Sequence, residues 1–346
     1  MFGHRYDGKK VKGMKVIDRA EPFFMPMRID AVNYINVKIP CANIDKFIAD
    51  ERKNGTHFTY MDIVFATIVR VLYMRPKLNR FIMRGSTYQR NGIFISMDVK
   101  KELNDEGESM TLKFPFTGRE SIYEVKDIID KEIARNMGGD SHDTTDVISK
   151  FTWLPDWMLR WALALFRFCD KHGLLGKLMV KASPFHTSCF VTNLKSIKLK
   201  YIYHHLYNFG TTSIFLSMGK EKMEPVVINN KELSIAKIMN LGISLDERIA
   251  DGLYMGKSLR IIEDIMSNPE CLKEGLPDDG TVPTKIKKTK KAKKVKSKKV
   301  KKPKKQKEKK AKETKPKKIK PLKNKEKAMK RAKKKEEKTL INNVHE

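Results

Sequence analysis

The sequence has few cysteines, and none of them is spaced as in a metal site or a redox motif. Cys41, Cys169, Cys189 and Cys271 are scattered through a chain of 346 residues. Neither a disulfide framework nor a zinc site is therefore expected. The first residues lack an apolar signal core, and no window approaches the roughly eighteen uncharged apolar residues of a membrane span. These absences favour a cytoplasmic protein.

The C-terminal residues 276–346 lack aromatic side chains and carry most of the net charge. Between Lys285 and Lys338 there are 31 Lys and Arg against five Glu, a net charge of +26, whereas the whole chain carries +31. So little apolar surface cannot offset an ordering entropy of about 1–2 kcal/mol per residue. We therefore expect a folded domain over residues 1–275 and a disordered polybasic tail over residues 276–346.

Two interpretations of this tail remain open. It would bind polyanions such as nucleic acid or an acidic membrane without sequence preference, with an affinity that falls as salt rises. Alternatively, it only keeps the protein soluble. Because no aromatic side chains are interleaved for base stacking, sequence-specific recognition of nucleic acid is not expected.

The body of the chain alternates between strand and helix patterns. Thr59 to Asp62 reads as a capping box before an apolar helix that ends at Pro76. Period-2 patterns predict strands at residues 34–40, 93–99, 110–116, 188–192 and 213–218. This order indicates an α/β domain with helices packed against a mixed sheet.

The segment LGISLDERIADG, from Leu241 to Gly252, lies between a strand pattern and a helix pattern. Apolar residues alternate from Leu233 to Leu245, which predicts a strand with one buried face. Helical spacing then continues to Asn268 and Pro269. The charged residues of DER therefore lie in a turn between two rigid elements, which is a suitable place for reactive side chains.

This turn resembles the DHRxxDG motif of the dihydrolipoyl acyltransferase cores of 2-oxo acid dehydrogenases, which are related to chloramphenicol acetyltransferase. Glu247 stands where the family has histidine. Other segments are similar to family strands and helices in the same order between Met14 and Leu272: RPKLNRF at 75–81, NGIFISMDV at 91–99, SIYEVKDIIDKEIARN at 121–136 and FVTNL at 190–194. The resemblance implies a chloramphenicol-acetyltransferase-like two-layer sandwich.

The resemblance also implies a coenzyme A-dependent acyltransferase that moves an acyl group from a CoA thioester to a thiol or hydroxyl acceptor. Such a reaction needs a base for the acceptor proton and a donor for the tetrahedral oxyanion. Carried over by position, Glu247 is the base and Thr192 the oxyanion donor, while Asp251 orients the turn or assists the oxyanion. The substrate-binding candidates are Asp246, Arg248, Gly252 and Asn193, and Gly252 would also allow a close turn into the helix.

Glutamate in the base position leaves two functions open. A free glutamate has a pKa of about 4.3 and a thiol about 8.5, so proton abstraction is uphill by roughly 6 kcal/mol unless burial raises the glutamate pKa. The chain is then either a working acyltransferase or a catalytically silent fold that binds a ligand or partner, anchored to polyanions by its tail. His186 is a possible surrogate base, and His204 and His205, which lie between the two strands that follow, could also approach the expected channel.

The expected partners follow from the same resemblance. They are acyl-CoA, an unknown small acceptor and two further copies of the chain, because the family's active channel lies between the subunits of a trimer. No lipoyl-carrying module precedes the core in this sequence, and neither a lipoyl group nor a metal is expected.

One segment, about residues 140–182, departs from the family. Its three tryptophans, Trp153, Trp157 and Trp161, lie four residues apart and so share one helical face. This face would pack against the domain or a neighbouring subunit, line an acyl pocket or lie on a membrane.

Overall fold

The computed structural model describes residues 5–100, 109–137, 154–228 and 232–277. Contacts divide the chain into a unit from Met1 to Ala292 and a second unit from Lys293 to Glu346. All described residues belong to the first unit. The expected tail and Trp153 lie outside them, so the tail prediction and the exact domain boundary stay predictions.

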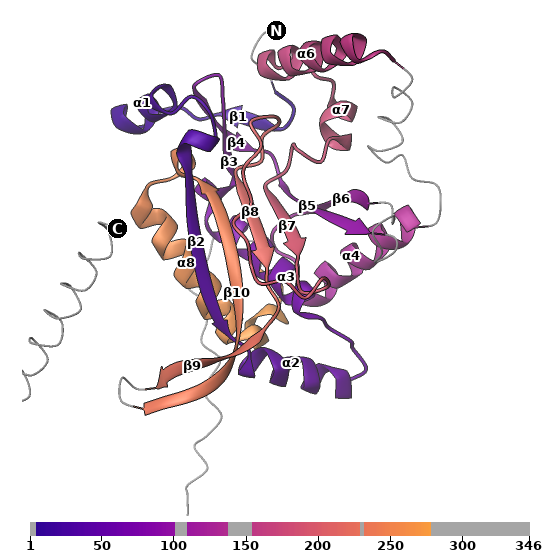
Figure 1. Ribbon diagram of the computed structural model, residues 1–346, viewed down its shortest axis with the longest axis vertical. Coiled ribbons are helices and arrows are strands. Elements are labelled where there is room, and N and C mark those ends of the chain that lie inside the picture. Colours follow the sequence, from indigo (N-terminus) through magenta and orange to yellow (C-terminus); the bar gives the residue numbers. More distant parts are fainter. Residues whose placement is uncertain (1–4, 101–108, 138–153, 229–231, 278–346) are drawn as a thin grey trace, which may run out of the picture. The chain divides into compact units, whose positions relative to one another are not determined.

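The centre of the domain is a seven-stranded mixed sheet (Figure 1). Its strand order is β2 (Val32–Pro40), β10 (Glu232–Asp246), β8 (Ile214–Met218), β7 (Cys189–Asn193), β5 (Ile93–Lys100) and β6 (Ser109–Phe116), with β9 (Lys222–Ile228) paired to the start of β10. Strands β5, β7 and β8 run parallel, and the remaining pairs are antiparallel. The predicted mixed sheet is therefore present.

A smaller antiparallel sheet and several short elements complete the unit. The small sheet has the order β1 (Gly8–Lys10), β4 (Ser86–Arg90) and β3 (Arg80–Met83). The short elements are α1 (Val16–Phe24), η1 (Ile29–Ala31), η2 (Pro76–Asn79), α7 (Lys177–Ala182), η3 (Glu247–Ile249) and η4 (Pro269–Leu272).

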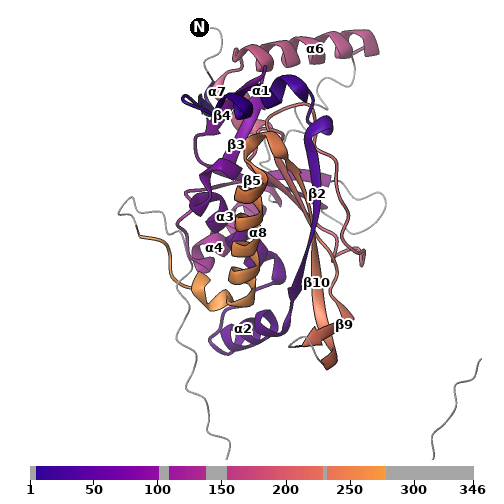
Figure 2. The same ribbon diagram turned by 90° about the vertical axis from the view of Figure 1, so that its left-hand side faces the viewer.

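Helices cover one face of the large sheet, as Figure 2 shows for α3, α4 and α8. These covering helices are α2 (Ala42–Lys53), α3 (Tyr60–Met74), α4 (Ile122–Met137) and α8 (Gly252–Ser267). The core lies between the two layers and contains the inward side chains of the strands, such as Ile95, Val191 and Ile243. The predicted capping box is present, because the side chains of Thr59 and Asp62 each bond the other residue's backbone N–H at the start of α3.

The other face of the sheet is more polar, because alternate residues of each strand point to opposite sides. On β10, Leu241, Ile243 and Leu245 belong to the core, so Gly242, Ser244 and Asp246 lie on the second face. The irregular segment 199–212 crosses this face. A Cβ at Gly242 would lie 2.3 Å from the carbonyl oxygen of Ile202, so only glycine permits this approach.

This covering segment corrects the expectation of a strand with one buried face. All residues of β10 from Ile238 to Asp246 are buried, because helices cover one side and segment 199–212 approaches the other. Conversely, Leu233 and Ile235 are 77% and 71% exposed, because this part of β10 pairs only with β9, outside the main sheet.

The helix that contains Trp157 and Trp161, α6 (Asp156–His172), does not pack its tryptophan face against the described part of its own chain. Trp157 is 65% and Trp161 is 73% exposed. The expected packing of this face against the domain is therefore wrong for these two residues. Instead, the opposite side of α6 is attached through Asp170, which accepts hydrogen bonds from Arg5 at 2.6 Å and 2.9 Å.

Lys113 of β6 gives the fold a pH dependence. Its Nζ donates to the carbonyl oxygens of Val180 and Ser183, at 3.0 Å and 3.1 Å. Burial, reinforced by the positive charge of Arg90, lowers the pKa of Lys113 to about 7. In the unfolded chain the lysine keeps its ordinary pKa, so the unfolded state binds more protons between pH 7 and pH 10.5. Lys113 therefore makes the fold more stable as pH rises.

We predict that Lys113→Met removes this contribution. From pH 6 to pH 8 the free energy of unfolding of the unaltered protein should rise by about 1 kcal/mol more than that of the variant, as urea titrations at the two pH values would show. Equal changes in both proteins would mean that Lys113 has an ordinary pKa in the folded state.

Candidate active site

The turn after β10 is held by a buried ion pair. Asp246, the last residue of β10, is fully buried, and its two carboxylate oxygens accept hydrogen bonds from Arg248 at 2.8 Å and 2.7 Å. Arg248 also donates to the carbonyl oxygen of Met25, at 2.6 Å. Asp246 and Arg248 thus fix the turn, and neither offers a charged group to solvent in this chain. Their predicted role in substrate binding stays a prediction, whereas the geometry gives them a positioning role.

A third charged group, Arg28, completes this cluster. Its Nε lies 3.9 Å from Oδ2 of Asp246, and its other nitrogens donate to the carbonyl oxygens of Tyr207 and Gly210, at 2.6 Å and 2.8 Å. Burial lowers the pKa of Arg28 to about 10, against the opposing effect of Asp246. The guanidinium thus remains charged at neutral pH and ties segment 199–212 to the end of β10.

Glu247 is the half-buried residue of this turn. Its Oε2 accepts a hydrogen bond from Nδ2 of Asn33 at 2.8 Å, which orients the carboxylate. The carboxylate remains partly accessible to solvent. Other carboxylates lie near it. The pKa of Glu21 is raised by burial and then by the negative charges of Asp18, Glu247 and Asp251. Glu247 therefore belongs to a group of carboxylates near the start of α8.

Asp251 caps the N-terminus of α8. Its Oδ1 accepts from the backbone N–H of Tyr254 at 2.8 Å, and this hydrogen bond lowers the pKa of Asp251. Lys77 lies 3.7 Å from its other oxygen. Gly252 begins α8, and within this chain the turn does not require glycine, because a Cβ there would have no atom within 4 Å and its φ is not positive. Its assignment to substrate binding stays a prediction.

Thr192 lies elsewhere, on the second face of the sheet. Cys189 and Val191 of β7 point into the core, so Phe190 and Thr192 point the other way. Thr192 is half-buried, and its hydroxyl has no hydrogen-bond partner within the described residues. The side chain of Asn193 accepts from the backbone N–H of Lys195 at 3.2 Å and so shapes the turn after β7.

One chain does not bring Thr192 and Glu247 together. Thr192 pairs with Ser217 on β8, which pairs with Gly242 on β10. Two strand spacings across the sheet and five residues along β10 place Glu247 more than about 15 Å from Thr192. A single reaction centre that uses both residues therefore requires a second copy of the chain.

His186 is a buried link within the chain. It is 1% exposed, with Nδ1 2.7 Å from Oγ of Ser183 and Nε2 3.1 Å from Oδ1 of Asp170. Because both nitrogens face protein groups, the structure gives no support to His186 as a surrogate base.

His204 is the histidine that shares the face of Thr192. Its Nδ1 lies 2.9 Å from the carbonyl oxygen of His205, and since a carbonyl only accepts, Nδ1 carries the proton and Nε2 has the lone pair. Its ring stacks on Phe215 at 3.9 Å, and Phe215 stacks on Phe190. Burial lowers the pKa of His204, which favours the neutral ring. Sequence spacing alone gave no way to distinguish His204 from a surface histidine.

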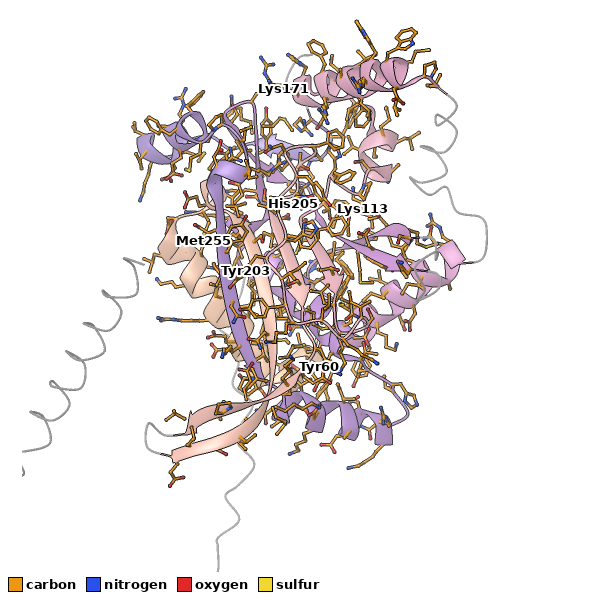
Figure 3. All side chains as sticks on the ribbon, viewed as in Figure 1. Tyr60, Lys113, Lys171, Tyr203, His205 and Met255 are labelled. Atoms are coloured by element: carbon orange, nitrogen blue, oxygen red, sulfur yellow. The ribbon has the colours of Figure 1, made fainter. Side chains whose placement is uncertain are left out.

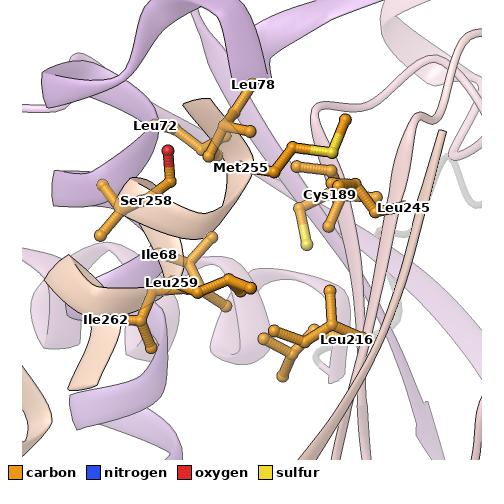
Figure 4. Close-up of a pocket in the computed structure, with 13 residues that line it drawn as sticks. Ile68, Leu72, Leu78, Cys189, Leu216, Leu245, Met255, Ser258, Leu259 and Ile262 are labelled. Carbon is orange, nitrogen blue, oxygen red and sulfur yellow. The ribbon is translucent and has the colours of Figure 1, made fainter. Parts of the chain in front are cut away.

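A separate cavity between α3, α8 and the sheet is not a substrate site (Figure 4). Its volume is about 40 Å³, enough for no more than one or two water molecules. The lining is apolar apart from Cys189 and Ser258, and the Ser258 hydroxyl already donates to the carbonyl oxygen of Tyr254. Neither Thr192 nor Glu247 lines it.

Two further findings concern the described residues only. They contain no group of three or more His, Cys, Asp or Glu side chains arranged to hold a metal ion. Among them, no helix combines the length and apolar character needed to cross a membrane.

Comparison with known proteins agrees with this geometry. Residues 187–273, which include both β7 and the turn after β10, match the family described as 2-oxoacid dehydrogenases acyltransferase (catalytic domain). No curated protein matches the chain.

Several solved structures are similar to this chain. The cubic core of the pyruvate dehydrogenase multienzyme complex is similar at 10% identity and a TM-score of 0.50, over 76% of this chain and 94% of that one. A probable dihydrolipoamide acetyltransferase from Listeria monocytogenes 4b F2365 has 14% identity and a TM-score of 0.48, over 75% of this chain and 94% of that one. Chloramphenicol acetyltransferase has 11% identity and a TM-score of 0.45, over 75% of this chain and 99% of that one.

The predicted resemblance to this family is therefore confirmed, and the fold is the chloramphenicol-acetyltransferase-like sandwich of the acyltransferase cores.

The buried ion pair at the site gives a stability prediction. Asp246→Asn would leave Arg28 and Arg248 buried without a counter-charge, and we expect the free energy of unfolding to fall by about 3–5 kcal/mol in urea titration. Asp50→Asn is the matched control, because Asp50 forms an exposed ion pair with Lys53 at 3.0 Å and should change little. A loss in Asp246→Asn no larger than in the control would contradict the supporting role of Asp246.

Proposed function

We propose that the protein is a coenzyme A-dependent acyltransferase that transfers an acyl group from a CoA thioester to a small thiol or hydroxyl acceptor. The observation that carries the proposal is that an acyltransferase fold contains two polar groups suited to this reaction, the hydroxyl of Thr192 and the carboxylate of Glu247. Thr192 presents a hydroxyl with no hydrogen-bond partner among the described residues, and Glu247 presents a half-buried carboxylate on a rigid turn.

Thr192 is the oxyanion donor in this proposal. When the acceptor attacks the thioester carbonyl carbon, the carbonyl oxygen gains negative charge, and a hydroxyl already aimed at that position stabilises it without reorganisation. Because no described group forms a hydrogen bond with the Thr192 hydroxyl, its proton remains free for this role. The strand β7, paired on both sides, holds the hydroxyl in place.

Glu247 takes the acceptor proton, and on collapse of the tetrahedral intermediate the C–S bond breaks and the leaving CoA sulfur takes that proton back from Glu247. Asn33 orients Glu247, while the Asp246–Arg248 ion pair fixes the backbone beneath it. Glutamate is better suited to an acceptor that loses its proton in concert with its attack than to one that must first become a free thiolate, because the free pKa values of glutamate and a thiol differ by about four units.

The reaction centre then lies between protomers. Because Thr192 and Glu247 are far apart in one chain, Thr192 of one protomer would face Glu247 of its neighbour. A homotrimer is the arrangement proposed, by analogy with the acyltransferase cores that share this fold. In this arrangement, the partly covered second face of the sheet would become the wall of a channel.

The rival function is a catalytically silent fold that binds a ligand or partner. The two differ in their response to coenzyme A, because a ligand that binds only the folded state raises the melting temperature. A protein that neither shifts with CoA nor turns over an acyl-CoA would support the rival.

The tail is proposed as a nonspecific ligand for polyanions in a reducing compartment such as the cytoplasm. Its composition supports this proposal, because 31 Lys and Arg between Lys285 and Lys338 are opposed by five Glu.

We predict that CoA and acetyl-CoA raise the melting temperature and that Glu247→Gln and Thr192→Val each reduce kcat by about 100-fold or more while this shift persists. The measurement is thiol release from acetyl-CoA with a panel of small acceptors. His204→Gln is the comparison variant. If it abolishes turnover while Glu247→Gln does not, the assignment of the base to Glu247 is wrong.

For the tail, binding to heparin should weaken steeply between about 50 and 200 mM salt and vanish when the residues after Pro277 are removed. Binding that survives the truncation would place the polyanion site in the body of the protein.

A further inference from the structure

Helix α6 presents two different sides. One side is attached to the protein: the ring of Phe166 lies 5.5 Å from that of Phe209, and Asp170 is 3% exposed between Arg5 and His186. These contacts fix how α6 is rotated about its axis. The other side is therefore held outward by the structure.

The outward side is an apolar stripe made of Trp157, Trp161, Leu165 and Phe168. These residues follow at intervals of four, four and three, so they lie one above the other on the helix. They are 65%, 73%, 56% and 52% exposed. A contiguous set of large exposed apolar side chains marks an interaction surface.

A row of cations runs along one edge of this apolar stripe. Arg160, Arg167 and Lys171 are all exposed, and their spacings of seven and four place them on one flank of the helix, with Lys171 at its C-terminal end (Figure 3). Asp156, at the first residue of α6, is its only exposed acidic side chain, because Asp170 is buried. The exposed surface of α6 is therefore aromatic on one side and cationic beside it.

This combination favours an anionic lipid surface over a second copy of the chain. Two copies that met through this stripe would bring their cationic rows close together, which is unfavourable. At a bilayer interface, by contrast, tryptophan rings lie at the level of the headgroups, and arginine and lysine extend from the apolar zone to phosphate. The polybasic residues 285–338 add charge of the same sign.

We propose that the apolar stripe of α6 docks the protein on an acidic phospholipid surface, with Arg160, Arg167 and Lys171 at the lipid phosphates. The helix lies in the interface and does not cross the membrane. This docking is independent of the proposed acyl transfer and would operate in a catalytically silent protein as well.

The tryptophans provide a direct test. All three tryptophans of the chain lie between residues 153 and 161, so tryptophan emission reports on this region alone. With vesicles of phosphatidylcholine and phosphatidylserine, we expect emission to move to shorter wavelength and to be quenched by brominated lipid. With phosphatidylcholine alone, partitioning should be at least about tenfold weaker.

Leu165→Glu places a charge in the apolar stripe and should weaken partitioning by at least about tenfold. Leu233→Glu is the matched control, because Leu233 is 77% exposed on β10, away from α6, and this variant should partition like the unaltered protein. Circular dichroism checks that both variants are folded.

Three outcomes would overturn the proposal. Vesicle binding without a change in tryptophan emission would mean that the tail alone makes contact. A spectral shift without lipid that grows with protein concentration would mean that a second copy covers the stripe. Equal partitioning of Leu165→Glu and Leu233→Glu would mean that the stripe is not the docking surface.

Discussion

The buried ion pair between Asp246 and Arg248 is the constraint on which the proposed site depends. It lies at the point where β10 ends, and it is linked to two other parts of the chain, the residues after α1 and segment 199–212. Arg248 bonds the carbonyl oxygen of Met25 after α1, and Arg28 joins the cluster while bonding the carbonyl oxygens of Tyr207 and Gly210. The cluster therefore fixes Glu247, the end of α1 and the segment that crosses the second face of the sheet. A buried ion pair contributes little net stability, but removal of one partner is costly, so it enforces a single geometry.

The two faces of the large sheet differ in polarity and in how they are covered. One face is closed by α2, α3, α4 and α8 and contains the apolar core. The other has Thr192, Ser217, Gly242 and Asp246 in neighbouring strands and is crossed by the irregular segment 199–212, while residues 180–184 contact it at Ser96 and Lys113. Segment 199–212 places His204 against Phe215 and leaves Thr192 half-buried, with a hydroxyl that no described group bonds. A polar, partly covered sheet face is the kind of surface that a second protomer completes.

Patterns within a short stretch of sequence predicted the elements well. The capping box at Thr59 and the strand and helix on either side of Asp246 depend on neighbouring residues, and the structure has each of them. Burial was predicted less well, because it depends on parts of the chain far away in sequence. The alternation along β10 could not show that segment 199–212 buries its second face. The period of the tryptophans indicated an apolar face, but it could not show that Trp157 and Trp161 remain exposed.

For the candidate site too, the sequence predicted the positions set by local patterns but not the contacts between distant residues. Motif order placed Glu247, Asp251 and Thr192 on the right elements, because strand and helix boundaries fix those positions. It could not show that Asp246 and Arg248 satisfy each other, that His186 lies 3.1 Å from an aspartate of α6, or that His204 has its lone pair on Nε2. Each of these facts depends on a contact between side chains or on the backbone geometry of a loop without regular structure.

The most direct test of a site shared between protomers is complementation of two inactive variants. Glu247→Gln and Thr192→Val would be co-expressed and compared with each variant alone. If each site combines Glu247 of one protomer with Thr192 of the next, random mixing in equal amounts restores about one quarter of the sites. Recovery of about a quarter of the original turnover is the predicted result. No recovery in mixed oligomers, with both single variants inactive, would contradict a site built from two copies of the chain.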